Sequence, residues 1–200
     1  MPVVAEHYYC RLGAIPLQVS DSIVTVKFNP LVPQPSIETF AATVEGLDES
    51  FVPERHDRGF YIFHVDAGYE IDSLIGNLYT KPVVELAFPA FTDTGENAVF
   101  ELSDLFVISY HNWVTQETMD SIQNYYHVQL EYGPYEITGS RGMLVTRQSG
   151  MNTLEIANRL YESGLVEYSQ PAMFSRVGQY PRPRWQFPCR SGGLDTLHFC

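Results

Sequence analysis

The sequence predicts an α+β fold built from two tandem ferredoxin-like βαββαβ modules, each an antiparallel four-stranded sheet covered by two helices. Two observations lead to this prediction. Short motifs recur in the same order about 82 residues apart, and apolar residues alternate between strand-like and helix-like periods within each copy. The predicted modules span residues 18–92 and 101–176.

The repeat consists of matched motifs that keep their order and differ by a single one-residue shift in spacing. Such ordered self-similarity is typical of a duplicated structural unit, whereas one matched dipeptide would carry no information. The matched pairs are Ser20-Asp21 with Ser103-Asp104, Arg58-Gly59 with Arg141-Gly142, Gly68 with Gly150, Leu78-Tyr79 with Leu160-Tyr161, Val84-Glu85 with Val166-Glu167, and Pro89-Ala90 with Pro171-Ala172.

Each copy begins with an apolar strand and an amphipathic helix. In the first copy, the helix is predicted from apolar residues three or four apart between Ile37 and Val44, after Pro35, which suits a first helical turn. In the second copy, Thr115 is the expected N-cap of a helix that begins near Gln116. The strands before these helices are expected at residues 22–29 and 105–112.

The remainder of each copy is expected to form two strands, a second helix and a closing strand. The helices are predicted from stripes of Ile, Leu and Ala residues at helical spacing, and the strands from short β-branched and aromatic runs. The expected strands cover residues 50–55, 59–65 and 83–88 in the first copy and 127–132, 142–147 and 165–169 in the second, with helices at 69–80 and 152–162.

Three segments lie outside the predicted modules. Residues 1–17 are expected to be an N-terminal extension, and residues 93–100, which are polar and contain Gly95, a linker. Residues 177–200 form a tail rich in Pro and Arg. Two interpretations of the tail stay open: a flexible link toward a further domain, or a proline-rich docking segment.

The composition argues against several classes of partner. The net charge is −12, from 24 acidic and 12 basic residues, so the surface is expected to repel nucleic acid and anionic lipid. No apolar run is long enough to span a membrane. Residues 1–13 lack the apolar core of a signal peptide. The sequence leaves the localisation undetermined, with secretion expected if the chain belongs to a protease precursor.

The sequence carries no catalytic, cofactor-binding or metal-binding motif. The histidines are scattered without chelating spacing, and no Cys/His pattern indicates zinc. Cys189 and Cys200 are expected either to remain inert thiols or to form a disulfide, and both alternatives stay open. We therefore expect no cofactor, no metal and no catalytic residue.

The segment from Asn152 to Phe174 (NTLEIANRLYESGLVEYSQPAMF) resembles the N-terminal propeptide of subtilisin-like serine proteases. The similarity lies in a helix with Leu and Ala on its inner face, a Gly-containing turn, and a strand that reads V-x-Y-A-x-P in the family. Ser169 stands here where Ala is commoner, and Gln170 where Glu is commoner. The first copy is similar to a more divergent version of the same module.

The resemblance implies a function in which the chain inhibits a subtilisin-like protease, assists its folding, or does both. It implies that the last strand and the residues after it contact the protease cleft, as an extended segment adds to exposed strand edges. The protease-binding candidates are Glu167, Tyr168, Pro171, Ala172, Met173, Phe174, Ser175 and Arg176.

The chain departs from the family in lacking the Asp, His and Ser segments of the catalytic domain. It is therefore expected not to be an enzyme, but a prodomain fragment, a free-standing inhibitor, or a relic that kept the fold. The alternative is a tandem ligand-binding or protein-interaction module with no protease partner. A small-molecule pocket between the two copies would favour that alternative.

Overall fold

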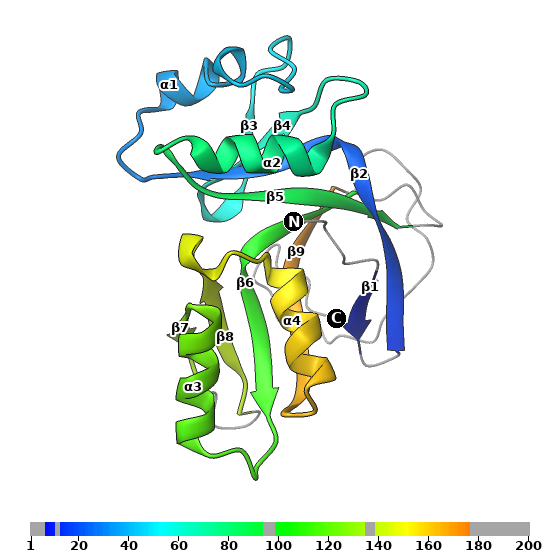
Figure 1. Cartoon of the computed structure of the whole chain (residues 1–200), viewed down its shortest axis with the longest axis vertical. Coiled ribbons are helices and arrows are strands. Elements are labelled where there is room, and N and C mark those ends of the chain that lie inside the picture. Colours follow the sequence, from blue (N-terminus) through cyan, green and yellow to red (C-terminus); the bar gives the residue numbers. More distant parts are fainter. Residues whose placement is uncertain (1–6, 11–12, 94–98, 135–138, 177–200) are drawn as a thin grey trace, which may run out of the picture.

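The computed structural model describes residues 7–10, 13–93, 99–134 and 139–176, which fold around a nine-stranded antiparallel sheet (Figure 1). The strands are β1 (His7–Cys10), β2 (Gly13–Phe28), β3 (Glu54–Arg55), β4 (Phe60–His64), β5 (Val84–Asp93), β6 (Val99–Tyr110), β7 (Val128–Tyr132), β8 (Arg141–Val145) and β9 (Val166–Arg176). The helices of the described part are α1 (Gln34–Glu38), α2 (Ile71–Thr80), α3 (Gln116–Tyr126) and α4 (Thr153–Glu162), with 3-10 turns η1 (Ala41–Thr43), η2 (Asp57–Gly59) and η3 (Arg147–Ser149).

The predicted fold class is wrong, because the strands form one continuous sheet and not two separate four-stranded sheets. The strand order is β3-β4-β2-β5-β6-β8-β7, with β1 paired to β2 and β9 paired to β6. The halves are joined where β5 pairs with β6, through Ala90 with Glu101, Phe91 with Phe100 and Thr92 with Val99.

The continuous sheet exists because four strands extend beyond the limits of the sequence repeat. β2 begins at Gly13 and β6 at Val99, although the repeated Ser-Asp motif places the start of each strand several residues later. In both strands the register shifts at this motif, between Val19 and Val24 in β2 and between Leu102 and Phe106 in β6. Before the shift, the residues of β6 pair with β5 across the junction, and those of β2 pair with β1 and with the end of β5. Part of the expected extension and linker is therefore strand.

The order of pairing inside each half is nevertheless the same. The first half pairs as β3-β4-β2-β5, and the second as β7-β8-β6-β9. The motif repeat in the sequence thus corresponds to a repeat in strand pairing within one sheet.

The first helix is shorter than the sequence predicts. The continuous helix expected between Ile37 and Val44 is replaced by the five-residue α1 and the separate turn η1. The hydroxyl of Thr39 donates to the carbonyl of Pro35, 3.2 Å away, at the point where α1 ends. Ile37 and Val44 are buried all the same, since the broken helix presents the same apolar side.

The other helices form where the sequence predicts them, and side chains cap the N-termini of α3 and α4. The side chain of Thr115 accepts a hydrogen bond from the amide of Thr118 at the start of α3, and that of Asn152 accepts from Glu155 at the start of α4. Figure 1 shows α2 lying across the first half, with α3 and α4 beside the second. A cap of this kind stabilises a helix by about 1 kcal/mol.

The largest apolar cluster includes residues from both halves. Phe60, Phe88 and Phe91 of the first half pack in the same cluster as Phe106 and Leu154 of the second, and all five are at most 1% exposed. A separate cluster lies under α1 and α2. The two halves therefore share a core, which is why the junction is not a simple linker.

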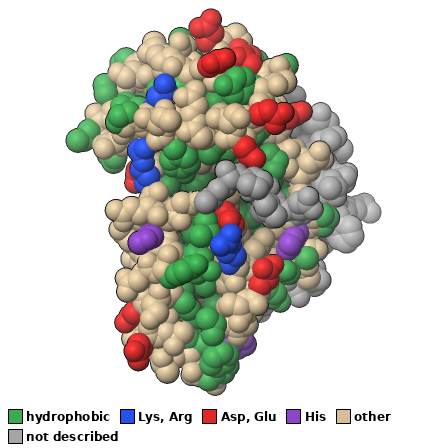
Figure 2. Space-filling model, viewed as in Figure 1, with side chains coloured by type: hydrophobic (Ala, Val, Ile, Leu, Met, Phe, Trp, Pro, Cys, Tyr) green, Lys and Arg blue, Asp and Glu red, His purple; other side chains and the backbone are tan. Residues whose placement is uncertain are grey.

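The visible surface agrees with the acidic composition. Figure 2 shows acidic side chains spread over this face of the molecule, with few Lys and Arg side chains among them. In the described part of the chain, no helix combines the length and apolar character needed to cross a membrane.

Candidate functional site

The predicted protease-binding residues all lie on β9, which pairs with β6 from Val166 to Arg176. Glu167 is exposed, and Tyr168 and Met173 are half-buried. The hydroxyl groups of Tyr168 and Ser140 form a short hydrogen bond.

The inner residues of this strand belong to the chain's own core. Pro171 is buried opposite Phe106, Ala172 is 1% exposed, and Phe174 is 5% exposed. Ser175 and Arg176 close the strand opposite Phe100 and Val99, and their side chains lie outside the described part of the structure. β9 is thus an integral strand of the sheet, and the buried side chains of Ala172 and Phe174 hold it against the core.

The end of β9 meets a loop from the first half. The ring of Phe174 lies 4.3 Å from the imidazole of His56, centroid to centroid. The same imidazole has its Nε2 atom 3.7 Å from the carboxylate of Glu101, whose side chain is 1% exposed. Residues far apart in sequence therefore meet at the point where β9 leaves the sheet.

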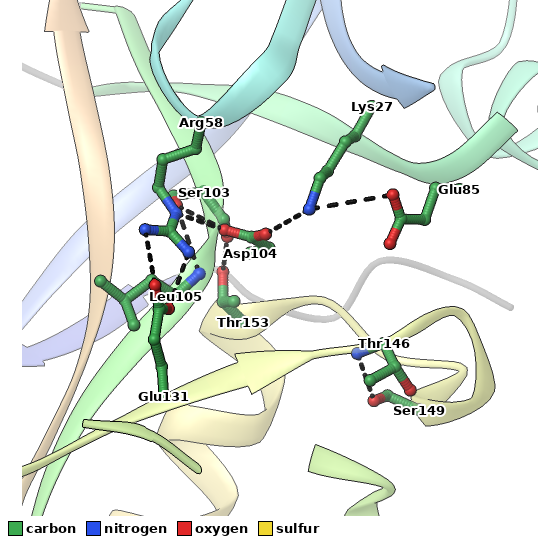
Figure 3. Close-up of polar contacts among 10 residues, drawn as sticks. All are labelled: Lys27, Arg58, Glu85, Ser103, Asp104, Leu105, Glu131, Thr146, Ser149 and Thr153. Carbon is green, nitrogen blue, oxygen red and sulfur yellow. Dashed lines mark hydrogen bonds and ion pairs between the residues drawn. The ribbon is translucent and has the colours of Figure 1, made fainter. Parts of the chain in front are cut away.

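A second buried carboxylate, Asp104, is the centre of an ion-pair network (Figure 3). Its side chain is 2% exposed, and its two oxygens lie 2.7 Å from Lys27 Nζ and 2.6 Å from Arg58 Nε. Arg58 also donates to Glu131, with Nη2 2.8 Å from the carboxylate. Since Lys27 and Arg58 come from the first half and Asp104 and Glu131 from the second, the network ties the halves together.

Arg58 adopts a conformation that is rare for its residue type. Its φ is 58°, in the left-handed region, which costs a non-glycine residue roughly 1–3 kcal/mol. Burial, the largest single effect, lowers the pKa of the guanidinium, but the hydrogen bonds to Asp104 and Glu131 and their charges outweigh it, so the pKa is raised overall. The charged network thus stabilises both the guanidinium and its strained backbone.

A cleft of about 430 Å³ opens between the halves, between α2 and the start of α4. Ala87, Phe88 and Pro89 of β5 form part of its wall. Arg147 reaches across it from η3 and donates to the carbonyl oxygens of Tyr79, 2.5 Å away, and Val84, 2.7 Å away. Side chains of α2 line one side, and the first turn of α4 lines the other.

Sequence reasoning missed both buried carboxylates and the cleft. The repeated Ser-Asp motif is the sequence signal that singles out Asp104. The aspartates of the two copies differ in the structure, since Asp21 is exposed and Asp104 is buried. Nothing in the spacing indicated that Glu101 is buried, since it lies between the apolar residues Phe100 and Leu102, next to the expected linker.

Among the residues that the structure describes, no three His, Cys, Asp or Glu side chains are grouped as metal ligands. The two buried carboxylates, Glu101 and Asp104, instead lie beside His56, Lys27 and Arg58 of the first half. Cys189 and Cys200, together with the tail of residues 177–200, lie outside the described residues.

Tyr110, at the end of β6, is a buried tyrosine whose ionisation is expected to make the stability of the protein depend on pH. Burial raises the pKa of its phenol to about 12, and its hydroxyl has no hydrogen-bond partner among the described residues. An unfolded tyrosine ionises near pH 10, so the unfolded state loses its proton first. Stability is therefore expected to fall as the pH rises from about 10 to about 12.

We expect Tyr110→Phe to reduce that loss of stability, measured by urea unfolding at several pH values across the window. Tyr125→Phe is the matched control, because Tyr125 is 71% exposed, and it should lose stability with pH as the unmodified chain does. Identical pH dependence in the Tyr110→Phe and unmodified proteins would contradict the expected role of burial.

No protein-family model, no curated protein and no solved structure matches this chain.

Proposed function

We propose that this protein binds a subtilisin-like serine protease in the manner of a propeptide, inhibiting the enzyme, assisting its folding, or both. The observation that carries the proposal is the arrangement of the Asn152–Phe174 segment. Its helix, α4, packs against the strand that follows, β9, and this strand ends the described sheet. That order of elements is the one that the resemblance implies.

The position of β9 also supports the proposal. Its residues pair with β6 on one edge, and in the described part no strand forms a hydrogen-bonded ladder with the other edge, although β1 contacts β9. A free strand edge accepts an extended segment of a partner through main-chain hydrogen bonds. The carboxylate of exposed Glu167 lies on this strand and is available to a partner's helix N-terminus.

The burial of Ala172 and Phe174 reduces the number of residues that we propose to contact the protease. Because these side chains support the chain's own sheet, we assign them to holding β9 in place rather than to filling protease pockets. The proposed contacts are Glu167, Tyr168 and Met173, followed by the residues after Phe174.

The test is inhibition of a panel of subtilisin-like proteases, measured as progress curves with a fluorogenic peptide substrate. We expect slow, tight inhibition of at least one enzyme by the full chain. A variant ending at Arg176 should inhibit at least about tenfold more weakly, a loss of about 1.4 kcal/mol in binding. A variant with residues 177–200 replaced by a Gly/Ser segment of equal length is the matched control for chain length, and it should behave like the truncated form.

Circular dichroism of the three proteins shows whether they remain folded. Absence of inhibition across the panel, or equal inhibition by the full and truncated chains, would contradict the proposed mechanism.

The alternative function, a ligand-binding or interaction module without a protease partner, is favoured by one observation. The cleft of about 430 Å³ lies between the two halves and has mostly apolar walls with a few charged groups. Both properties are common in small-molecule sites.

A further inference from the structure

The cleft between α2 and α4 contains open space beside Gly76, and no packing contact of the protein explains a glycine at that position. Gly76 lines it from the middle of α2, and a Cβ atom placed there would meet no atom within 4 Å. A glycine inside a helix costs about 1 kcal/mol relative to alanine. Since no neighbour demands a glycine at this position, its effect is to leave space above the helix.

Four residues of α2 face the cleft at helical spacing: Asp72, Ile75, Gly76 and Tyr79. Asp72 lies in the first turn of the helix, and Arg147 donates to the carbonyl of Tyr79 in the last turn. Seven residues with a rise of about 1.5 Å each separate the two ends by about 10 Å. A negative and a positive group thus stand at opposite ends of one wall.

Neither of these two charges is matched by an opposite charge. Asp72 has no hydrogen-bonding side chain and no ion pair among the described residues, and Arg147 bonds to two neutral carbonyl oxygens there. The third charged group of the lining, Glu155, is paired with Arg159 at 2.8 Å. The α2 dipole explains why Asp72 and Arg147 are stable at these ends, but it leaves both charges open to a ligand.

Between the two charges the walls are apolar. Phe88 and Pro89 of β5 form one side, and Ile75 and Met151 line the cleft with them. A ligand complementary to this lining has an apolar body, an ammonium group at the Asp72 end and a carboxylate at the Arg147 end. An extended chain of three residues spans at most about 10 Å, which matches the rise of α2 from Asp72 to Tyr79.

We propose that the cleft binds a short apolar peptide of three residues with free termini. The amino terminus pairs with Asp72, the carboxylate with Arg147, and the side chains lie against Phe88 and Met151. This inference does not rest on the proposed protease partner, because the peptide binds this chain alone.

The experiment is calorimetric titration of the full chain with the tripeptide Ala-Leu-Ala, without any protease. We expect saturable binding with a dissociation constant below about 1 mM. The N-acetylated and the C-amidated forms of the same tripeptide should each bind at least about tenfold more weakly, since each loses one ion pair. Free leucine should also bind at least about tenfold more weakly, because it cannot span both charges.

Two variants locate the site. Gly76→Leu places a side chain in the cleft, at a position where its Cβ meets no atom within 4 Å, and it should weaken tripeptide binding at least about tenfold. Ser73→Leu places the same side chain at an exposed position of α2 that does not line the cleft, and it should leave binding unchanged. Asp72→Asn should weaken binding of the free tripeptide and leave that of the N-acetylated form unchanged.

No saturable binding of the tripeptide, equal binding of the blocked forms or of leucine, or equal effects of Gly76→Leu and Ser73→Leu would each overturn the proposal. Circular dichroism confirms that each variant is folded. Because these titrations contain no protease, their outcome is independent of the inhibition test.

Discussion

Replacement of Asp104 by alanine is expected to lower the free energy of unfolding by about 3–5 kcal/mol. The carboxylate is 2% exposed and lies within 2.7 Å of both Lys27 Nζ and Arg58 Nε. Removing it leaves two cations at the junction without their shared partner. Losing one member of a buried ion pair is far more destabilising than losing an exposed one, because the remaining charge is poorly solvated.

The measurement is urea unfolding followed by far-UV circular dichroism. Arg159→Ala is the matched control, because it removes an ion pair with Glu155 in which the arginine side chain is 48% exposed. That control should cost less than about 0.5 kcal/mol. A loss below about 1 kcal/mol for Asp104→Ala would show that the network does not hold the halves together.

Replacement of Phe91 by alanine is expected to cost about 3–5 kcal/mol and to destabilise both halves together. Phe91 is fully buried on β5, pairs with Phe100 across the junction, and packs in the cluster that the two halves share. The cavity left by its ring would therefore open in the shared core and not in one half alone.

Hydrogen exchange distinguishes a shared core from two independent units. In the Phe91→Ala variant, amides of β4 in the first half and β8 in the second should lose protection to the same extent. Phe51→Ala is the control, because Phe51 is 49% exposed, and it should cost less than about 1 kcal/mol. Loss of protection confined to one half would mean that the halves unfold separately.

The sequence predicted the parts of the fold that local pattern determines. α4 was expected at 152–162 and lies at Thr153–Glu162, because its apolar stripe and its N-cap are both local signals. The repeated motifs likewise anticipated the order of elements in the two halves. These local signals do not depend on which strand pairs with which in the sheet.

The joining of the halves was not predictable in the same way. Residues 13–17 and 99–100 fall in the predicted extension and linker, yet they form strand because partner edges are present in space. Strand formation depends on such non-local pairing more than on the preference of the segment itself. The boundaries of a repeat therefore did not mark the boundaries of the sheet.

The candidate site residues also differ in whether local sequence or contacts between the halves determine their positions. The sequence predicted a closing strand at 165–169, but it predicted neither the continuation of that strand to Arg176 nor the burial of Glu101 and Asp104. A buried carboxylate requires counter-charges, and here Lys27, His56 and Arg58 come from the other half of the chain. No spacing rule connects residues that meet only after the sheet has formed.

The contact of β1 with α4 has a consequence for how the protein acquires its structure during synthesis. The side chain of Asn158 donates to the backbone carbonyl of His7, 2.7 Å away and 151 residues earlier. β1 can pair with β2 early, but its hydrogen bond to α4 forms only after the ribosome has released most of the chain. Contacts between such distant residues slow folding. A nascent chain stopped after β5 would expose Phe88 and Phe91, and we expect it to need a chaperone until the second half emerges.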